Sequence, residues 1–112
     1  MEDCIFCKIA QGKIKSDTVY EDNDFLAFRD ISPQAPVHIL IIPKKHIAKL
    51  YDTEDFALLG RLMRIASKLA KDSGVEQSGY RLVLNTNSDG GQSVDHIHIH
   101  LLGGRAMQWP PG

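Results

Sequence analysis

"SVDHIHIHLLGG", residues 93–104, places a histidine at every second position of a short aliphatic segment. Side chains of a β-strand alternate between its two faces, so this period of two predicts a strand at 96–102 with every imidazole on one face. The aliphatic residues between the histidines then point the other way, into a core beneath a helix. A merely solvated face would accept Thr, Lys or Glu equally well, so we infer that the imidazoles have chemical roles. The three histidines are His96, His98 and His100.

The chain has 112 residues, of which 43% are hydrophobic and 24% are charged, with a formal net charge of -1. This length and mixture suit one globular domain, residues 1–112, with a modest core. The balanced charge disfavours extensive binding to nucleic acid or to an anionic membrane. No stretch approaches the roughly 20 apolar residues that cross a bilayer, and the N-terminus does not resemble a secretory signal. We expect a cytoplasmic protein that binds neither nucleic acid nor membranes.

The remaining periodicities predict an α+β domain with a five-stranded, mostly antiparallel sheet, one long helix and one short helix. Between Thr53 and Asp72, apolar residues recur at three- and four-residue steps, which marks one face of a helix. Asp52 or Thr53 is expected to cap its start, and Gly74 suits the left-handed residue just past its end. The expected strands are 18–21, 25–29, 37–42, 80–86 and 96–102, and the expected helices are 5–11 and 53–72.

Two chemistries suit a row of imidazoles. Imidazole is a common metal ligand, although residues two apart usually supply only two ligands to one ion. Unprotonated imidazole can also attack phosphorus, provided that a hydrogen bond at Nδ1 leaves Nε2 free. The preceding loop favours the second chemistry, because the amides of Gly90, Gly91 and Gln92, with the hydroxyl of Ser93, suit an anion-binding concavity. Taken alone, the same loop is more typical of a tight turn, and only its position next to the histidine strand favours anion binding.

The N-terminal segment "CIFC" holds Cys4 and Cys7, whose two-residue spacing suits a tetrahedral zinc ion. A second pair of ligands must then come from elsewhere in the chain. The alternative is a pair of reduced thiols packed under the sheet. A redox disulfide is disfavoured, because no thioredoxin-like context surrounds the pair.

The motif "HIHIHLL" resembles the signature of the histidine triad (HIT) superfamily of nucleotide hydrolases and transferases. The likeness extends to "DISPQAPVHILIIPKKHI" and "GGQSVDHIHIHLLGGRAMQWPPG", so it covers nearly the whole chain. The terminal "GGRAMQWPPG" is similar to the Hint branch of nucleotide-binding proteins. The resemblance implies a hydrolase that cleaves the P–N bond of purine nucleoside 5′-phosphoramidates, such as adenosine phosphoramidate or aminoacyl- and lysyl-adenylates. It would form a nucleotidyl-histidine and release a nucleoside monophosphate and an amine.

The same resemblance implies residue roles. His98 is the expected nucleophile, the carbonyl of Gly91 holds its Nδ1–H, and His100 contacts the phosphate and helps the amine to leave. His38 completes the proton-handling group, and Asp30 accepts hydrogen bonds from the ribose hydroxyls. The implied catalytic set is His38, His96, His98 and His100, and the implied nucleotide- and phosphate-binding set is Asp30, Ile31, Asn85, Gly91, Gln92, Ser93, His98 and His100.

The resemblance further implies a structural zinc ion and a homodimer. Catalysis itself would require no cofactor, and the expected ligands are purine nucleotides such as AMP and GMP. Strands aligned across a two-fold axis would form one ten-stranded sheet and cover an otherwise exposed edge, with Trp109 reaching toward the partner's site. The implied zinc ligands are Cys4, Cys7, His46 and His96.

Alternatives remain at this point. Taken singly, Asp30 is also typical of a turn, Asn85 of a strand end, and His38 of a core histidine. Asp95 departs from the family pattern, where an aromatic residue is common, and we expect it to alter packing or dimer contacts. The competing functions are a nucleotide-binding or scaffold protein with incidental catalysis, a dinucleotide hydrolase or nucleotidyl transferase of the same fold, and a metal-dependent hydrolase.

Overall fold

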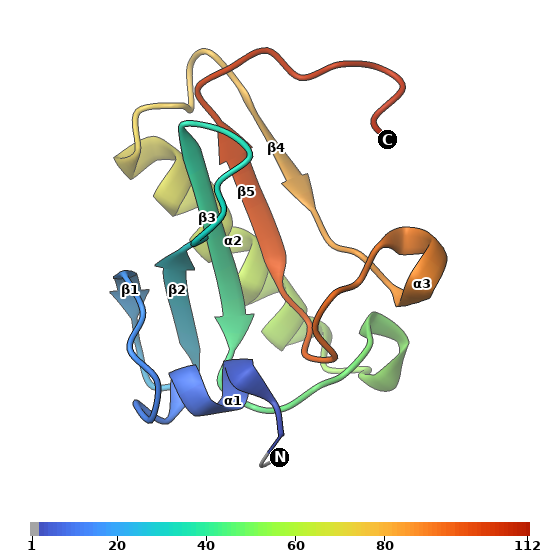
Figure 1. Cartoon of the computed structure of the whole chain (residues 1–112). Helices are drawn as coiled ribbons and strands as arrows, with labels where there is room; N and C mark the ends of the chain where they lie inside the picture. The colour runs from blue at the N-terminus through green and yellow to red at the C-terminus, as the bar shows by residue number, and fades with distance from the viewer. Residues whose placement is uncertain (1–2) are drawn as a thin grey trace.

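A five-stranded sheet with the order β1-β2-β3-β5-β4 forms the centre of the molecule, and every neighbouring pair of strands is antiparallel. The computed structural model describes residues 3–112 (Figure 1). The predicted α+β architecture is therefore confirmed. The strands are β1 (Thr18–Glu21), β2 (Phe25–Arg29), β3 (Val37–Pro43), β4 (Tyr80–Val83) and β5 (Ile99–Gly103), and the helices are α1 (Ile5–Ala10), α2 (Phe56–Asp72) and α3 (Asn87–Gly90), with a 3-10 turn at Leu50–Asp52.

Helix α2 covers one face of the sheet and buries its apolar stripe there (Figure 1). Ile97, Ile99 and Leu101 belong to this buried cluster, which confirms that the aliphatic residues between the histidines face the core. Burial of such side chains is the main source of stability for a helix on a sheet. Within residues 3–112, no helix is both long and apolar enough to span a membrane.

The start of α2 differs from the prediction. Residues 50–52 form a 3-10 turn, so the helix begins only at Phe56. Asp55 is its N-cap, and its carboxylate accepts a hydrogen bond from the Leu58 amide at 3.0 Å. The expected cap at Asp52 or Thr53 is therefore wrong, because the extra turn consumes those residues. Gly74 has a φ of 75° just past the helix, as its conformational freedom predicts.

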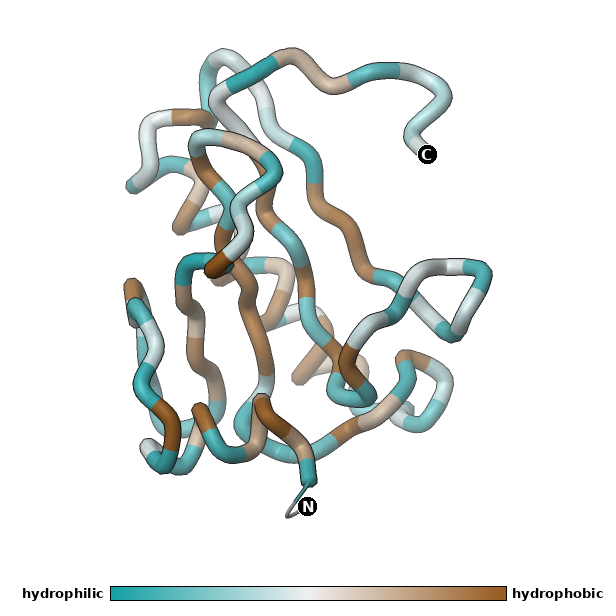
Figure 2. The backbone as a smooth tube through the Cα atoms, viewed as in Figure 1, coloured by the Kyte–Doolittle hydropathy of each residue, from teal (hydrophilic) through white to brown (hydrophobic). Residues whose placement is uncertain are grey.

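Helix α1 lies against part of the opposite face. Its Phe6 packs in a smaller apolar cluster with side chains from β2 and β3, and Figure 2 shows both strands as mostly hydrophobic. This face also carries the histidines, so they lie partly beneath α1 rather than in open solvent. The other members of this cluster are Leu26, Phe28, Leu40 and Ile42.

The histidine strand is shorter than predicted, because β5 begins only at Ile99. The amide of Ile97 donates to the carbonyl of Ile47 at 2.7 Å, and the amide of His96 donates to Val94 at 2.9 Å. These bonds draw the segment before Ile99 out of the regular ladder. Strand β4 likewise ends at Val83 instead of 86, and residues 87–90 form a short helix that the sequence did not predict.

Candidate active site

The main-chain carbonyl of His96 sets the tautomer of the His98 ring. Its Nδ1 lies 2.8 Å from the carbonyl oxygen of His96. A carbonyl can only accept, so Nδ1 carries the hydrogen and Nε2 of the neutral ring keeps its lone pair. The expectation that the Gly91 carbonyl would hold this hydrogen is wrong, because the irregular chain before β5 turns the His96 carbonyl toward the ring.

Nε2 of His98 remains available to a ligand. No hydrogen bond within residues 3–112 engages it, and no buried side-chain nitrogen or oxygen in this range lacks a partner. The atom must therefore reach an open space, although the residue as a whole is only 3% exposed. An unprotonated, accessible imidazole nitrogen is what nucleophilic attack requires.

His100 has the opposite arrangement, which is set through His38. The backbone amide of Gln34 donates to Nδ1 of His38 at 3.0 Å, so the neutral His38 ring carries its hydrogen on Nε2. That Nε2 lies 2.9 Å from Nδ1 of His100 and donates to it. His100 consequently has its own hydrogen on Nε2. One ring thus offers a lone pair and the next ring offers an N–H donor, and the two ring centroids lie 4.9 Å apart.

Asp30 is the negative charge nearest to this relay. Its Oδ2 lies 3.5 Å from Nε2 of His38, while its Oδ1 accepts from the Ser32 amide at 2.8 Å. The turn before Pro33 thereby fixes the carboxylate beside the imidazoles. Of its two predicted roles, the turn role is observed directly, and it does not exclude contact with a ligand.

Burial keeps these histidines neutral. It lowers the pKa of His38 and of His98. The Asp30 charge offsets only part of the effect on His38, and the hydrogen bond to the His96 carbonyl together with the Asp30 charge offsets only part of the effect on His98. Burial first, and then the charges of His98 and His38, lower the pKa of His100 to about 4. At neutral pH the free protein therefore holds the uncharged tautomers described above.

A largely apolar pocket of about 320 Å³ lies against the imidazoles. His98, His100, Asp30 and Ser93 provide polar groups in its wall, so these predicted residues are brought together. Ile31, which is 98% exposed, also contributes. The apolar wall comprises Ile5, Phe6, Ile9, Phe28, Leu40 and Val94. An apolar pocket with a few polar groups in its wall suits a nucleotide.

The glycine-containing loop does not form the expected amide concavity. The amides of Gly91 and Gln92 already donate to the carbonyls of Ser88 and Asn87, both at 3.0 Å, at the end of α3. Gly91, Gln92 and the predicted Asn85 are also not among the described residues that line the pocket. The loop forms a helical turn, which sequence spacing did not indicate, and this turn consumes the donors.

The Gln92 side chain instead holds the loop in place. Its amide nitrogen donates to the carbonyls of Ala48 and Val94 at 2.7 and 3.0 Å, and its oxygen accepts from Lys49 at 3.2 Å. Lys49 also donates to Asp95 at 2.6 Å. Asp95, which stands where the family commonly has an aromatic residue, therefore forms an exposed ion pair. These contacts fix the 92–95 segment from which Ser93 enters the pocket.

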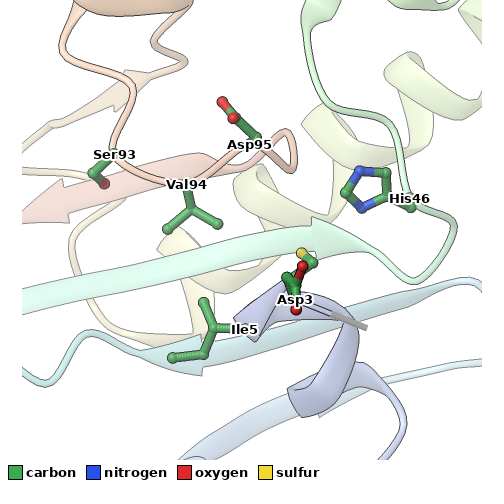
Figure 3. A pocket seen from close by; sticks show the side chains of 7 residues that line it. Asp3, Ile5, His46, Ser93, Val94 and Asp95 are labelled. Atoms are coloured by element: carbon green, nitrogen blue, oxygen red, sulfur yellow. The ribbon is translucent and has the colours of Figure 1, made fainter. Parts of the chain in front are cut away.

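A second cluster lies at the N-terminal end of α1. Cys4, Cys7, His46 and His96 place one ligand atom each within 4.8 Å of one another. Nδ1 of His46 lies 3.2 Å from the Cys7 sulfur, and Nδ1 of His96 lies 3.4 and 3.6 Å from the Cys4 and Cys7 sulfurs. Figure 3 shows His46 beside a hollow that Asp3 and Asp95 also line.

The His96 ring has the tautomer that a metal requires. Its Nε2 lies 2.7 Å from the Pro43 carbonyl and donates to it, which leaves the Nδ1 lone pair directed toward the sulfurs. Burial, opposed by this hydrogen bond, lowers the pKa of His96 to about 4. Burial and the neighbouring Cys4 raise the pKa of the Cys7 thiol. The predicted four residues are thus brought together.

Two contributors to the site were not predicted from the sequence. The ring of Phe6 stands edge-on to His98, with centroids 5.0 Å apart, and Gln34 acts through its backbone amide. Phe6 lies between the two cysteines, so its position next to the cluster was a usable signal. The Gln34 contact uses only main chain, and residue type carries no information about it.

Comparisons with known proteins agree with this geometry. A profile of the HIT domain matches residues 11–107. An uncharacterized HIT-like protein of Synechococcus elongatus is 55% identical over 113 residues, which is 99% of this chain and 98% of that protein. The purine nucleoside phosphoramidase of Escherichia coli is 53% identical over 108 residues, which is 95% of this chain and 91% of that protein.

The same likeness holds in three dimensions. The crystal structure of a HIT family hydrolase from Legionella pneumophila matches with a TM-score of 0.96 at 60% identity, covering 98% of this chain and all of that one. These likenesses make the protein an enzyme, a hydrolase. The chain belongs to the HIT family.

Proposed function

We propose that this enzyme hydrolyses the P–N bond of purine nucleoside 5′-phosphoramidates through a nucleotidyl group carried on His98. The observation that carries the proposal is the opposite protonation of two adjacent rings. Nε2 of His98 is a free lone pair, and Nε2 of His100 is an N–H donor, at the same pocket. A nucleophile beside a proton donor is the arrangement that group transfer at phosphorus needs.

In the first step, Nε2 of His98 attacks the α-phosphorus, and the bond from phosphorus to the amine nitrogen breaks. The anionic phosphate favours the protonated form of the hydrogen-bonded His38–His100 pair, which takes one proton from solvent. Nε2 of His100 gives its proton to the departing nitrogen while Nδ1 of His100 takes the proton that it shares with His38, so the amine leaves uncharged and both rings are then neutral. The Nδ1–H of His98 remains bonded to the His96 carbonyl and stabilises the charge on the ring.

In the second step, water attacks the phosphorus and the bond to Nε2 of His98 breaks. The now neutral His100 accepts one proton from that water, which restores the proton used in the first step. The nucleoside monophosphate leaves, and His98 returns to its neutral tautomer. His38, which donates to His100, and the Asp30 carboxylate 3.5 Å away support this change of charge.

The pocket supports a purine nucleotide as the substrate. Phe28 and Leu40 provide an apolar floor for a base, and α1 contributes Phe6 and Ile9. Asp30 lines the same pocket and lies 3.5 Å from Nε2 of His38, where its carboxylate would accept from ribose hydroxyls. The name of the Escherichia coli relative agrees with this substrate class.

The test is to mix the protein with adenosine 5′-phosphoramidate, quench within milliseconds, and map an acid-labile nucleotidyl adduct by mass spectrometry. We expect the adduct on His98, and we expect His98→Ala to lose it together with at least about 10⁴-fold in kcat. AMP binding by His98→Ala, measured by calorimetry, controls for folding. Steady turnover by that variant would contradict the mechanism.

The cysteine–histidine cluster supports a structural zinc ion. Zn–S and Zn–N bonds of about 2.3 and 2.05 Å at the tetrahedral angle separate sulfur from nitrogen by about 3.6 Å. The three sulfur–nitrogen distances here are 3.2, 3.4 and 3.6 Å, so the donor set and its spacing fit the ion. The ion would hold α1 against the sheet, and all four protein ligands would close its coordination.

The edge of the sheet at β4 supports a homodimer. Its four residues, Tyr80–Val83, are all half-buried, and on the neighbouring helix Phe56 and Met63 are 75% and 51% exposed. Pairing of β4 with its two-fold mate would join two sheets into one of ten strands and cover this edge. Light scattering coupled to gel filtration tests the assembly, and a monomer mass at micromolar concentration would contradict it.

A further inference from the structure

A row of paired residues crosses the sheet from the imidazoles to its far edge. In the strand register, His100 lies opposite Leu40, Leu40 opposite Phe28, and Phe28 opposite Thr18. Directly paired residues of neighbouring strands point to the same face, so this row follows the floor of the pocket. From β5 to β1 it covers three strand spacings, or about 14 Å, which is close to the length of an extended purine nucleotide.

The chemistry of the pocket changes along this row. Its β5 end has the imidazoles and its middle is apolar, whereas Asp17, just before β1, lies at the other end with Arg29 of β2. Lys15 and Ser16 belong to the same wall. A nucleotide with phosphorus at His98 therefore runs toward β1 and presents the far edge of its base to Asp17.

Asp17 is fixed in place but has a free acceptor. Its carbonyl accepts from the Arg29 amide at 3.0 Å, which attaches its main chain to β2. Only one carboxylate oxygen meets the Arg29 guanidinium, at 3.2 Å, and the two side chains are 67% and 60% exposed. An exposed, singly bonded ion pair contributes little to stability, so the carboxylate can turn to a ligand at small cost.

We infer that Asp17 reads the Watson–Crick edge of the base and makes the enzyme prefer guanosine over adenosine substrates. Guanine presents two adjacent donors there, N1–H and the N2 amino group, which match the two oxygens of a carboxylate. Adenine presents one donor and the N1 lone pair, which a carboxylate repels. The inference rests on the proposed function, since the base lies at Asp17 only when the phosphorus lies at His98.

The test compares kcat/KM for guanosine, inosine and adenosine 5′-phosphoramidates of one amine. Inosine keeps N1–H but lacks the amino group, so we expect the order guanosine, inosine, adenosine, with about a tenfold span. Asp17→Ala should remove the preference. Asp17→Asn should reverse it, because a side-chain amide both donates and accepts and so complements adenine. A merely structural role for Asp17 would not reverse the order.

Asp24→Asn is the matched control, because Asp24 forms a similar exposed pair with Arg61 outside the pocket. It should keep the guanosine preference. Equal use of guanosine and adenosine by the unmodified enzyme, or an unchanged ratio in Asp17→Asn, would overturn the inference. Loss of the guanosine preference in Lys15→Ala, but not in Asp17→Ala, would also overturn it.

Failure of the proposed function is distinguishable, because it would appear as no cleavage of any of the three substrates. Calorimetric titration with GMP and AMP then still tests whether Asp17 selects guanine over adenine. Equal affinity for the two nucleotides would overturn it, and weaker GMP binding by Asp17→Asn would support it.

Discussion

The carbonyl oxygen of His96 accepts a hydrogen bond from Nδ1 of His98 at 2.8 Å, while the His96 ring faces the sulfurs of Cys4 and Cys7. One residue therefore joins the cysteine cluster to the proposed nucleophile. Phe6, which lies between the cysteines in sequence, makes edge-on contacts with the rings of His96 and His98, with centroids 5.9 and 5.0 Å away. The His96 carbonyl and the Phe6 ring thus position His98, while no hydrogen bond within residues 3–112 engages its Nε2.

Metal removal should consequently loosen the pocket more than it slows the chemistry. We expect one zinc ion per chain by elemental analysis, and we expect a strong chelator to lower the thermal midpoint. KM for a nucleoside phosphoramidate should rise, because α1 contributes to the pocket wall, while kcat changes by less than about threefold, because no metal ligand is the attacking atom.

Cys7→Ser tests the same site genetically. It should lose the ion and show the same lower midpoint before any chelator is added. Stoichiometric absence of metal in protein purified without chelators, together with no effect of a chelator on the midpoint, would contradict the zinc proposal.

Replacement of His38 should slow the reaction through His100. His38→Leu removes the N–H that donates to Nδ1 of His100 at 2.9 Å, so the His100 tautomer is no longer fixed. We expect kcat to fall by about 10²-fold or more, with a small change in KM, as for loss of a general acid–base partner. Steady-state kinetics with one phosphoramidate measures both constants.

His38→Gln is the matched variant, because its amide nitrogen can still donate to His100. It should recover part of the lost kcat. If the Leu and Gln variants were equally slow, the proposed hydrogen-bond relay would be wrong and a packing role for His38 would remain.

Acid should destabilise the fold through the buried imidazoles. Burial, with the charges of His98 and His38, holds the pKa of His100 at about 4, below the value of about 6.5 in an unfolded chain. Between these two pKa values the unfolded state binds more protons than the folded state. The contribution of neutral His100 to the free energy of unfolding is therefore complete above pH 6.5 and is lost as the pH falls toward 4.

The thermal midpoint should therefore be flat from pH 7 to 8 and fall between pH 6.5 and 4.5. His100→Gln cannot titrate and should show a shallower fall, measured by calorimetry in the same buffers. An equally steep fall in this variant would show that other groups control the acid response.

Truncation of a core residue from the histidine segment should be costly even though it is remote from the chemistry. Leu101 is fully buried between the sheet and α2, so Leu101→Ala leaves a cavity and should lower the free energy of unfolding by about 2–5 kcal/mol. Ile31→Ala, at an exposed position, should change it by less than about 0.5 kcal/mol. Urea unfolding measures both, and similar values for the two variants would contradict this assignment of the core.

The periodic parts of the sequence predicted the fold well. Alternation identified β1, β2 and β3 within a residue, and the three- and four-residue steps identified α2, because apolar spacing follows directly from strand and helix geometry. Spacing could not indicate the 3-10 turn before α2 or the helical turn α3. Both depend on local hydrogen bonds that compete with the pattern.

The candidate site was predicted in its residue types and only partly in its contacts. His98, His100 and Asp30 do meet at one pocket, His38 lies behind it in contact with His100, and the four expected metal ligands do converge. The Gly91 carbonyl and the loop amides were assigned wrongly, because main-chain direction depends on where a strand loses its register. The identity of a residue does not indicate the direction of its main-chain carbonyl.

The sequence by itself determined which side chains share a face of the sheet, since the period of two leaves no other choice for a strand with one buried face. Only the tertiary structure decided which nitrogen of each imidazole keeps its hydrogen. That choice is made by the His96 carbonyl and the Gln34 amide, which are backbone groups common to nearly all residues, and they act only where the folded chain brings them against a ring.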